Sequence, residues 1–282
     1  MNRMTALQRV IDRVGVPVVL KTVSAGTIKT AYLEAGSGDP VLLLHGVSSA
    51  GITWYPVIGP LSAHFRVIAP DIVGYGESDK PAADYDPPYY CAWLTAFLDA
   101  VGVQKAHFVG HSQGGAISLR FALDSPARVK SLVLVDSAGL GVGSGVLFGA
   151  LLAMLCYNLF PSRTTGLWLT RQVLHDPQNL DPALGEYIDE VIKSPGGRRA
   201  LLRGRAHTRI PPEQLAQNAQ PTLIIWGQDD RLLPVAQAKA AAKELPHAQL
   251  QVIAQAGHTP FFDQTQQFND AVLSFLNAVG TS

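Results

Sequence analysis

The stretch that most constrains this chain is Gly110-His111-Ser112-Gln113-Gly114, in which glycines stand two residues before and two residues after a serine. Residues 105–109 before it are typical of a strand, and residues 116–123 after it have the pattern of a helix. A serine on so sharp a turn needs unusual backbone angles, and side chains at the two glycine positions would collide across it. We therefore predict that the Ser112 hydroxyl stands above a sheet edge, where a helix N-terminus favours negative charge.

Two further residues follow Ser112 along the chain. Asp230 comes after an apolar, strand-like run at 221–226, and His258 comes after another at 249–253. A serine hydroxyl is a poor nucleophile until a base takes its proton. Histidine has a suitable pKa for taking that proton and returning it, and a carboxylate holds the imidazole in the required tautomer. The three residue types together predict a nucleophilic serine site.

These motifs resemble those of the α/β-hydrolase family, whose members carry serine, acid and histidine in this chain order. The resemblance covers about residues 27–276 and includes residues 71–78, which are similar to the family's D-x-x-G-x-G-x-S segment. It implies that Ser112 is the nucleophile and His258 the base. It also implies that Asp230 is the acid, because the family acid is the fourth residue of a G-x-x-D pattern.

The resemblance further implies two backbone N–H groups for the oxyanion of the tetrahedral intermediate. They belong to Gln113, just after the nucleophile, and to Val47, just after His45-Gly46. Such donors must already be aimed at the developing charge. His45 is expected to shape the loop rather than to move protons, and it is also a candidate for the substrate pocket.

Each assignment has an alternative. Ser112 could serve only as a helix N-cap, since serine is a preferred cap. Asp229 stands beside Asp230, and Asp136 also ends a strand after the nucleophile, where some family members place their acid. The flanking glycines and the downstream partners favour the nucleophile, and the family pattern favours Asp230.

Apolar runs alternate with helical patterns over most of the chain. This alternation predicts an α/β fold, the α/β-hydrolase fold, with a mostly parallel central sheet and helices on both faces. The first two strands are expected to be antiparallel, with a turn at residues 24–26. The expected strands are 16–21, 27–34, 41–44, 66–69, 105–109, 129–135, 221–226 and 249–253, and the expected helices, after a short N-terminal one, are 54–63, 89–101, 116–123, 235–245 and 265–279.

The alternation lapses after Asp136, where prolines punctuate a helical pattern. Because the family inserts its lid at this place, we assign residues 137–210 to a helical cap inserted after the sixth strand. Residues 1–136 and 211–282 are then the core domain.

Residues 137–162 of the cap carry no charge, and their length alone would suffice for a membrane span. Glycines crowd the first half, so that only residues 146–160 are convincingly apolar, and no stable span is expected. So broad an apolar surface packs on the domain, lines a pocket, pairs with another subunit or touches lipid. We favour a pocket wall for an apolar acyl group, with Leu151 and Leu155 in it.

Composition excludes several other classes of function. The 22 basic and 22 acidic residues give a formal net charge of zero, which favours neither nucleic acid nor an anionic membrane as a partner. Two cysteines do not make a disulfide framework, and no secretory signal is visible, so a cytoplasmic location is expected. His107 and His111 would lie about 13 Å apart on a strand, too far to share a metal ion. We expect no metal and no cofactor, and either a monomer or a homodimer.

Residues around the nucleophile reduce the number of reactions that this chain is expected to catalyse. A carboxylate in that position would indicate dehalogenases or epoxide hydrolases of the same fold. Carbon–carbon bond hydrolases of ring-cleavage pathways usually have Asn-Ser-Met there and tryptophan after the histidine, whereas this chain has His111-Ser112-Gln113 and Thr259. The sequence therefore predicts a serine esterase acting on a small-molecule ester, with short- to medium-chain acyl groups favoured. A carbon–carbon bond hydrolase, a ligand receptor and an acyltransferase remain alternatives, since fold does not decide function.

Overall fold

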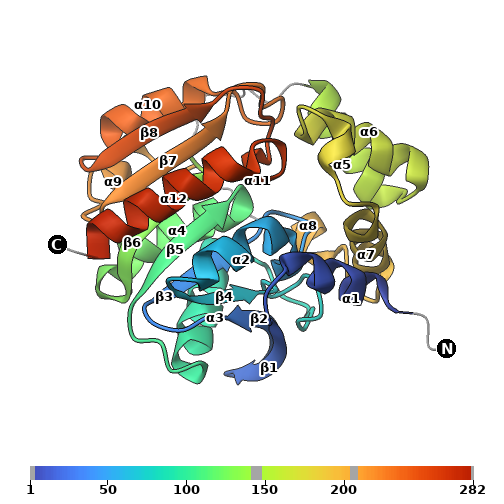
Figure 1. Ribbon diagram of the computed structural model, residues 1–282, viewed down its shortest axis with the longest axis horizontal. Helices are drawn as coiled ribbons and strands as arrows, with labels where there is room; N and C mark the ends of the chain where they lie inside the picture. Colours follow the sequence, from blue (N-terminus) through green and yellow to red (C-terminus); the bar gives the residue numbers. More distant parts are fainter. Residues whose placement is uncertain (1–3, 141–147, 204–208, 281–282) are drawn as a thin grey trace.

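The computed structural model describes residues 4–140, 148–203 and 209–280, and it is built around one eight-stranded sheet (Figure 1). The strand order is β1-β2-β4-β3-β5-β6-β7-β8. β1 pairs with β2, and β2 with β4, in antiparallel fashion, while every later pairing is parallel. The strands are β1 Val19–Ala25, β2 Ile28–Ala35, β3 Pro40–Leu44, β4 Arg66–Pro70, β5 Ala106–His111, β6 Val129–Val135, β7 Thr222–Gly227 and β8 Ala248–Ile253.

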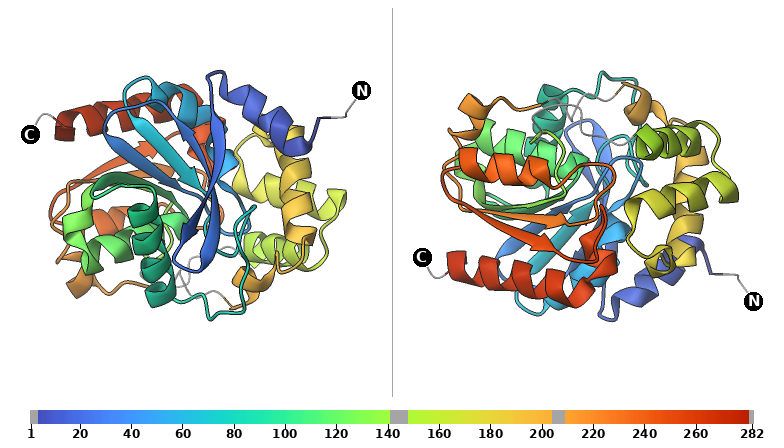
Figure 2. Two further views of the ribbon diagram at one scale, coloured as in Figure 1. Left: turned by 90° about the horizontal axis from the view of Figure 1, so that it is seen from below. Right: turned by 90° about the horizontal axis from the view of Figure 1, so that it is seen from above.

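Helices cover both faces of this sheet, as Figures 1 and 2 show. On one face α3 (Pro87–Ala100), α4 (Gln113–Asp124) and α10 (Ala236–Glu244) pack on the strands. On the other lie α2 (Tyr55–Ser62) and α12 (Thr265–Gly280). Together these elements confirm the α/β-hydrolase fold that the sequence predicts.

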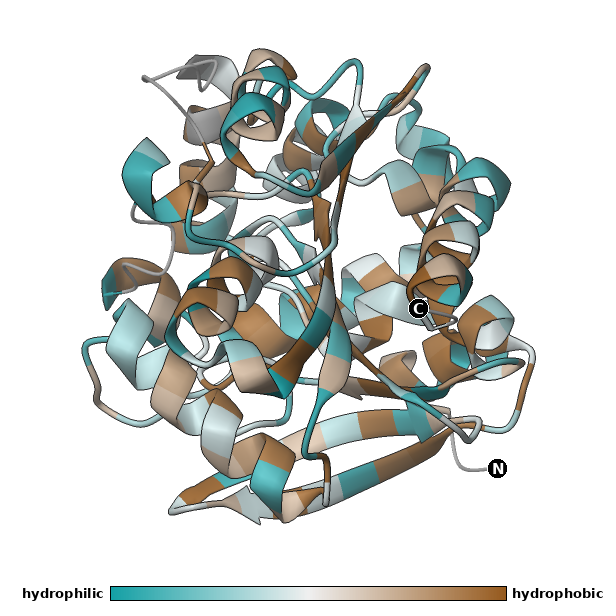
Figure 3. Ribbon diagram, turned by 90° about the vertical axis from the view of Figure 1, so that its left-hand side faces the viewer, coloured by the Kyte–Doolittle hydropathy of each residue, from teal (hydrophilic) through white to brown (hydrophobic). Residues whose placement is uncertain are grey.

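The central strands are apolar on both sides because both faces are covered. Successive residues of β3 enter different cores: Leu42 and Leu44 pack with α3 and α4, while Val41 and Leu43 pack with α2 and α12. The strands in the middle of the sheet are accordingly brown in Figure 3, whereas the surrounding helices carry both colours.

The element boundaries differ from the sequence expectation by a few residues. The first strand begins at Val19 rather than at residue 16, because Pro17 has no N–H to give to a ladder. It runs through Ala25, so that the turn to β2 is made by Gly26 and Thr27. α3 begins two residues early, since Asp86 caps it by accepting the Tyr89 N–H.

Between β6 and α9 (Pro212–Leu215) the chain leaves the sheet, and we call residues 137–210 the helical insertion. Its described part contains α5 (Phe148–Leu159), α6 (Arg163–Val173), α7 (Pro182–Lys193) and α8 (Arg199–Arg203). α5, α6 and α7 lie together beyond one side of the sheet, at the right of Figure 1. The short α1 (Ala6–Ile11) packs against α7, and α11 (Pro260–Asp263) precedes α12. The division into core and cap remains a prediction.

α5 is buried along one part of its surface only. Ala150, Ala153, Tyr157 and Asn158 are buried, whereas the side chain of Leu155 is 46% exposed. Within the described residues, no helix has the length and apolar character that crossing a membrane requires.

Candidate active site

Ser112 lies in the sharp turn between β5 and α4. Its backbone angles, φ 50° and ψ −114°, lie in a region that side chains other than glycine rarely adopt. Such strain costs on the order of 1–3 kcal/mol and persists only where neighbours fix it. The Ser112 N–H donates to the Val135 carbonyl at 2.9 Å, and the Ser112 carbonyl accepts from the Ala138 N–H at 3.0 Å.

The two flanking glycines have the steric role that the sequence predicts. A Cβ atom on Gly110 would lie 2.5 Å from the Gly114 carbonyl oxygen. A Cβ atom on Gly114 would lie 2.2 Å from the Leu44 carbonyl oxygen at the end of β3. The turn therefore tolerates only glycine where α4 passes over the ends of β3 and β5.

His258 and Asp230 form a buried pair on the loops after β8 and β7. The His258 Nδ1 atom lies 2.7 Å from the Asp230 Oδ2 atom. The other oxygen, Oδ1, accepts the N–H groups of Leu232 and Leu233 at 2.7 and 2.9 Å. These bonds fix the carboxylate, which in turn selects the imidazole tautomer with the proton on Nδ1. The Nε2 atom is then left to accept a proton.

His111 connects the histidine loop to the serine turn. Its Nε2 atom donates to the His258 carbonyl oxygen at 2.8 Å, and the two rings lie 4.8 Å apart. Burial holds the pKa of His111 well below its usual range, so the ring stays neutral. Trp54 and Phe261 pack around it with ring centroids at 6.4 and 5.3 Å. Ser112 and His258 thus lie on loops that share a rigid aromatic support.

The two predicted oxyanion donors are the N–H groups of Gln113 and Val47. Gln113 begins α4, so its N–H is one of the helix's first four, which have no intrahelical acceptor. The loop before Val47 passes beside the nucleophile, because a Cβ atom on Gly46 would lie 3.4 Å from the Ser112 Cβ atom. The roles of both N–H groups remain predictions.

His45 is fully buried at the start of that loop. Its Nδ1 atom donates to the Gly46 carbonyl oxygen at 2.7 Å, and its Nε2 atom accepts the Ile72 N–H at 2.9 Å. Burial lowers the pKa of His45 to about 4, so the ring is neutral near pH 7. Because both ring nitrogens of His45 bond to the main chain, this arrangement supports the proposed role in shaping the loop rather than the one in the substrate pocket.

The segment that resembles D-x-x-G-x-G-x-S supports the same loop through its first and last residues. The Asp71 carboxyl group accepts the N–H groups of Gly51 at 2.6 Å and Glu77 at 2.7 Å. Ser78 donates to the Asp71 carbonyl oxygen at 2.7 Å and accepts the Ala31 N–H at 3.0 Å. This motif therefore fixes the chain between β4 and α3.

Of the two alternative acids, Asp229 points away from His258. Its Oδ2 atom lies 2.7 Å from Nδ1 of His175, which belongs to the helical insertion, and both side chains are about two-fifths exposed. Adjacent residues thus have different partners, and the arrangement favours Asp230 as the acid.

Asp136 is fully buried beside Asp230. One atom each of Asp136, Asp230 and His258 lies within 4.8 Å of the others. The Asp136 Oδ1 atom accepts the Gly227 N–H at 2.9 Å. Its Oδ2 atom has no hydrogen-bond donor among the described residues, so a negative charge there would be buried without a partner.

Electrostatics decides which carboxyl group of this pair carries the proton. Burial, and then the charges of Asp230 and Asp263, raise the pKa of Asp136 well above its usual range. Two buried carboxylates so close cannot both ionise cheaply. Burial beside a second carboxyl group therefore favours the protonated form of Asp136. These three residues are also the one group in the described parts of the chain that could hold a metal ion.

Sequence reasoning missed two residues that join the helical insertion to the site. Asn158 of α5, 1% exposed, accepts a hydrogen bond from the Ser48 hydroxyl group at 2.6 Å, next to Val47. Asp263 accepts hydrogen bonds from four N–H groups. One is the main-chain N–H of Gly257, beside the histidine, and the other three belong to the insertion: the main chains of His175 and Asp176 and the side chain of Asn179. A lone asparagine in an uncharged apolar run was a signal for the first. The Asp263 contacts depend on the tertiary fold and had no local signal.

The helical insertion also bonds directly to the histidine loop. The His258 N–H donates to the Val173 carbonyl oxygen, at the end of α6, at 2.7 Å. The predicted pocket residue Leu155 is half exposed on α5, and its place in the pocket wall remains a prediction. The side chain of Leu151 lies outside the described residues.

Comparison with known proteins identifies the family of this chain. A model described as the alpha/beta hydrolase family matches residues 41–271. The chain belongs to the alpha/beta hydrolase family. A relative, 2-hydroxy-6-oxo-2,4-heptadienoate hydrolase of Pseudomonas putida F1, is 33% identical over 275 residues, which are 92% of this chain and 96% of the relative.

Two solved structures superpose closely on this chain. A meta-cleavage product hydrolase from Pseudomonas fluorescens IP01 has a TM-score of 0.83 at 30% identity, covering 92% of this chain and 97% of its own. Naproxen esterase from Bacillus subtilis has a TM-score of 0.86 at 22% identity, covering 96% and 95%. The second likeness shows the fold alone.

Asparagine substitutions should separate the three acids. Asp230→Asn should lower kcat by about 10⁴, because the histidine then loses the partner that selects its tautomer. Asp136→Asn should cost less than about tenfold, because an amide can replace the protonated carboxyl group as donor. Asp229→Asn serves as the adjacent-position control, with circular dichroism to check folding. A greater loss in Asp136→Asn or Asp229→Asn than in Asp230→Asn would contradict the assignment.

The proton on Asp136 should also appear in the pH dependence of stability. Because Asp136 binds its proton more tightly in the folded than in the unfolded protein, it lowers stability as pH rises above about 4. Relative to wild type, Asp136→Asn should gain about 1.4 kcal/mol of unfolding free energy per pH unit until Asp136 ionises in the folded state. Urea unfolding at a series of pH values between about 5 and 7 measures this slope. The exposed Asp270→Asn on α12 is the charge-matched control, and equal slopes in both variants would refute the protonated state.

Proposed function

We propose that this protein is a serine hydrolase of carboxylic esters, acting through an acyl-enzyme on Ser112. The observation that carries the proposal is the strained turn at Ser112, tied through His111 to the loop that holds the buried His258–Asp230 pair. Strain of this kind persists where neighbouring structure fixes it, and it concentrates at functional sites.

The proposed reaction has two halves. The Nε2 atom of His258 takes the Ser112 proton as the hydroxyl oxygen attacks the ester carbonyl carbon, and the oxyanion faces the N–H groups of Val47 and Gln113. The imidazolium returns the proton to the alkoxide as the C–O bond breaks, leaving the acyl group on Ser112. Water then attacks with the same base, and the carboxylic acid leaves. Asp230 stabilises the imidazolium in both halves.

We propose that the helical insertion caps this site. Its contacts with Ser48 and His258, on loops at either side of Ser112, support this role. Such a cap excludes water and offers apolar surface to an acyl chain, and Leu151 and Leu155 are its proposed pocket residues.

A carbon–carbon bond hydrolase is the second candidate function. The Pseudomonas putida relative favours it, since that protein acts on 2-hydroxy-6-oxo-2,4-heptadienoate and covers nearly the whole chain. The residues beside the nucleophile favour the ester, because His111 and Gln113 replace the asparagine and methionine usual in carbon–carbon hydrolases. Thr259 likewise stands where those enzymes usually have tryptophan.

Removing the Ser112 hydroxyl group should abolish turnover and covalent labelling. Ser112→Ala should lower kcat by about a millionfold, as removal of a triad serine typically does. A fluorophosphonate probe should label the wild-type protein at Ser112, identified by peptide mass spectrometry, and leave the variant unlabelled. Ser118→Ala, on α4 and fully buried, controls for loss of a serine hydroxyl group from the same helix. Labelling at another residue would sink the proposal.

A panel of p-nitrophenyl esters from acetate to palmitate, with 2-hydroxy-6-oxo-2,4-heptadienoate beside it, tests the substrate class. We expect kcat/KM to rise about tenfold for two added methylene groups while they fit, since each contributes about 0.8 kcal/mol on burial. Leu155→Asp should flatten this trend. A higher kcat/KM for the dienoate than for every ester would favour the second candidate. If acetate is the best ester and Leu155→Asp has the same chain-length preference as wild type, then Leu155 does not line an acyl pocket.

A further inference from the structure

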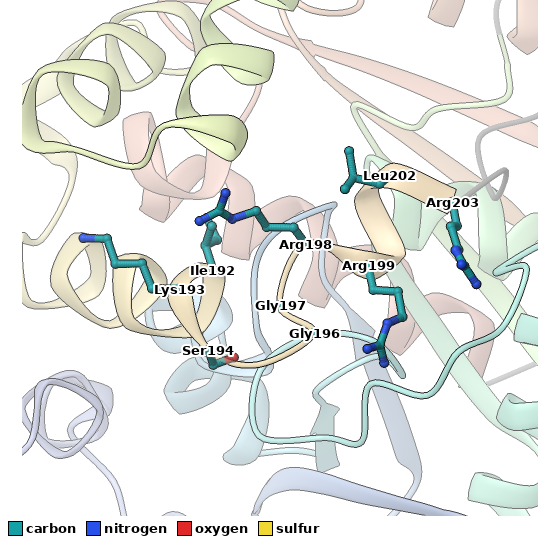
Figure 4. A pocket seen from close by; sticks show the side chains of 9 residues that line it. All are labelled: Ile192, Lys193, Ser194, Gly196, Gly197, Arg198, Arg199, Leu202 and Arg203. Carbon is teal, nitrogen blue, oxygen red and sulfur yellow. The ribbon is translucent and has the colours of Figure 1, made fainter.

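A pocket of about 360 Å³ lies in the helical insertion between the end of α7 and α8. Figure 4 shows four cationic side chains along it, and no carboxylate group belongs to its lining. Its charged lining residues are Lys193, Arg198, Arg199 and Arg203.

Among the described residues, no carboxylate group forms an ion pair with the arginines of this pocket. Arg198 donates to the Leu159 carbonyl oxygen at 3.0 Å, and Arg199 donates to the Lys80 carbonyl oxygen. Carbonyl oxygens take up one of the five guanidinium N–H groups and leave the positive charge in place. Of the four cations, Lys193 is paired with a carboxylate, that of Asp189 at 3.6 Å.

The sequence on either side of the pocket has the same bias. Residues 191–212 contain no aspartate or glutamate, and neither do residues 137–175, which include α5 and α6. The formal neutrality of the whole chain therefore hides a local excess of positive charge on the insertion.

Large apolar side chains are exposed beside these cations. Leu202, which lines the pocket, is 63% exposed. Phe160, which follows the residue that Arg198 binds, is 71% exposed. Exposed apolar residues gathered among cations are the features of proteins that lie on an anionic lipid surface.

We propose that this face of the helical insertion docks on an anionic phospholipid surface. The side chains of Leu202 and Phe160 enter the boundary between headgroups and acyl chains, and Lys193, Arg198 and Arg203 lie at the phosphate groups. The docking is independent of the proposed ester hydrolysis, since it requires no turnover.

Charge and shape select this occupant over two others. A two-fold dimer through the same face would bring one set of cations against another, which is repulsive. A free phosphate ion would satisfy the arginines but would leave Leu202 and Phe160 in water. An anionic lipid surface would both neutralise the cations and bury the two apolar side chains.

Vesicle sedimentation tests the proposal with the whole chain. Binding is measured on vesicles of equal parts phosphatidylglycerol and phosphatidylcholine, and on pure phosphatidylcholine, at low salt and at about 1 M salt, where the Debye length is about 3 Å. We expect binding to the mixed vesicles that falls steeply with salt, and weak binding to phosphatidylcholine. Equal binding to both vesicle types would overturn the electrostatic half of the proposal.

Matched variants locate the docking face. Lys193→Gln with Arg203→Gln should lower the partition coefficient about thirtyfold, whereas Lys239→Gln with Lys243→Gln, the same charge change on α10, should leave it unchanged. Leu202→Ser should lower it about tenfold, and Leu20→Ser, an exposed leucine of β1, should not. Hydrolysis of a soluble ester by each variant checks folding separately from docking.

Three outcomes would overturn the proposal. One is equal loss of vesicle binding in the α10 control pair. Another is binding of inorganic phosphate, measured by calorimetry, that Arg203→Gln abolishes in a protein that binds no vesicles. The third is a concentration-dependent dimer, seen by analytical ultracentrifugation, that Leu202→Ser dissociates.

Discussion

The close approach of α4 to the ends of β3 and β5 is the constraint on which the rest of the site depends. At Gly114 the helix lies so near the Leu44 carbonyl oxygen that a methyl group would not fit. This contact forces Ser112 into its unusual backbone angles, and hydrogen bonds to Val135 and Ala138 keep it there. Because β3 also carries the loop to Val47, the same contact sets the distance between the nucleophile and the proposed oxyanion donors.

A second constraint is the cost of burying charge. Three ionisable groups, Asp136, Asp230 and His258, are buried together at the ends of β6, β7 and β8. Burial raises the pKa of Asp136, and its protonated form lowers the free-energy cost of placing two carboxyl groups side by side. The neighbouring His45 and His111 are also held neutral by burial. Among the three histidines near Ser112, His258 is the one with a buried carboxyl group against its ring, which supports its proposed role as the base.

The helical insertion is bonded to this machinery rather than merely lying over it. Val173 accepts the His258 N–H, Asn158 accepts the Ser48 hydroxyl group, and Asp263 binds both the histidine loop and the start of the segment after α6. A displacement of α5 or α6 would therefore move His258 and the loop that carries the proposed oxyanion donor Val47. The outer surface of the insertion, with its arginines and exposed leucines, is free to make contacts of a different kind.

The sequence by itself determined the fold class, the turn at Ser112 and the chain order of the predicted triad. These follow from local features: apolar runs bounded by glycines, and residue types whose chemistry is specific. It left Asp136, Asp229 and Asp230 as rival acids, since neighbouring residues on a loop point in directions that no local pattern fixes. It proposed Leu155 as a pocket residue, but composition cannot say which side of an all-apolar helix is covered. Only the tertiary structure decided the contacts. Hydrogen bonds between distant loops pair Asp230 with His258 and Asp229 with His175, burial raises the pKa of Asp136, and on α5 Asn158 is buried while Leu155 is half exposed.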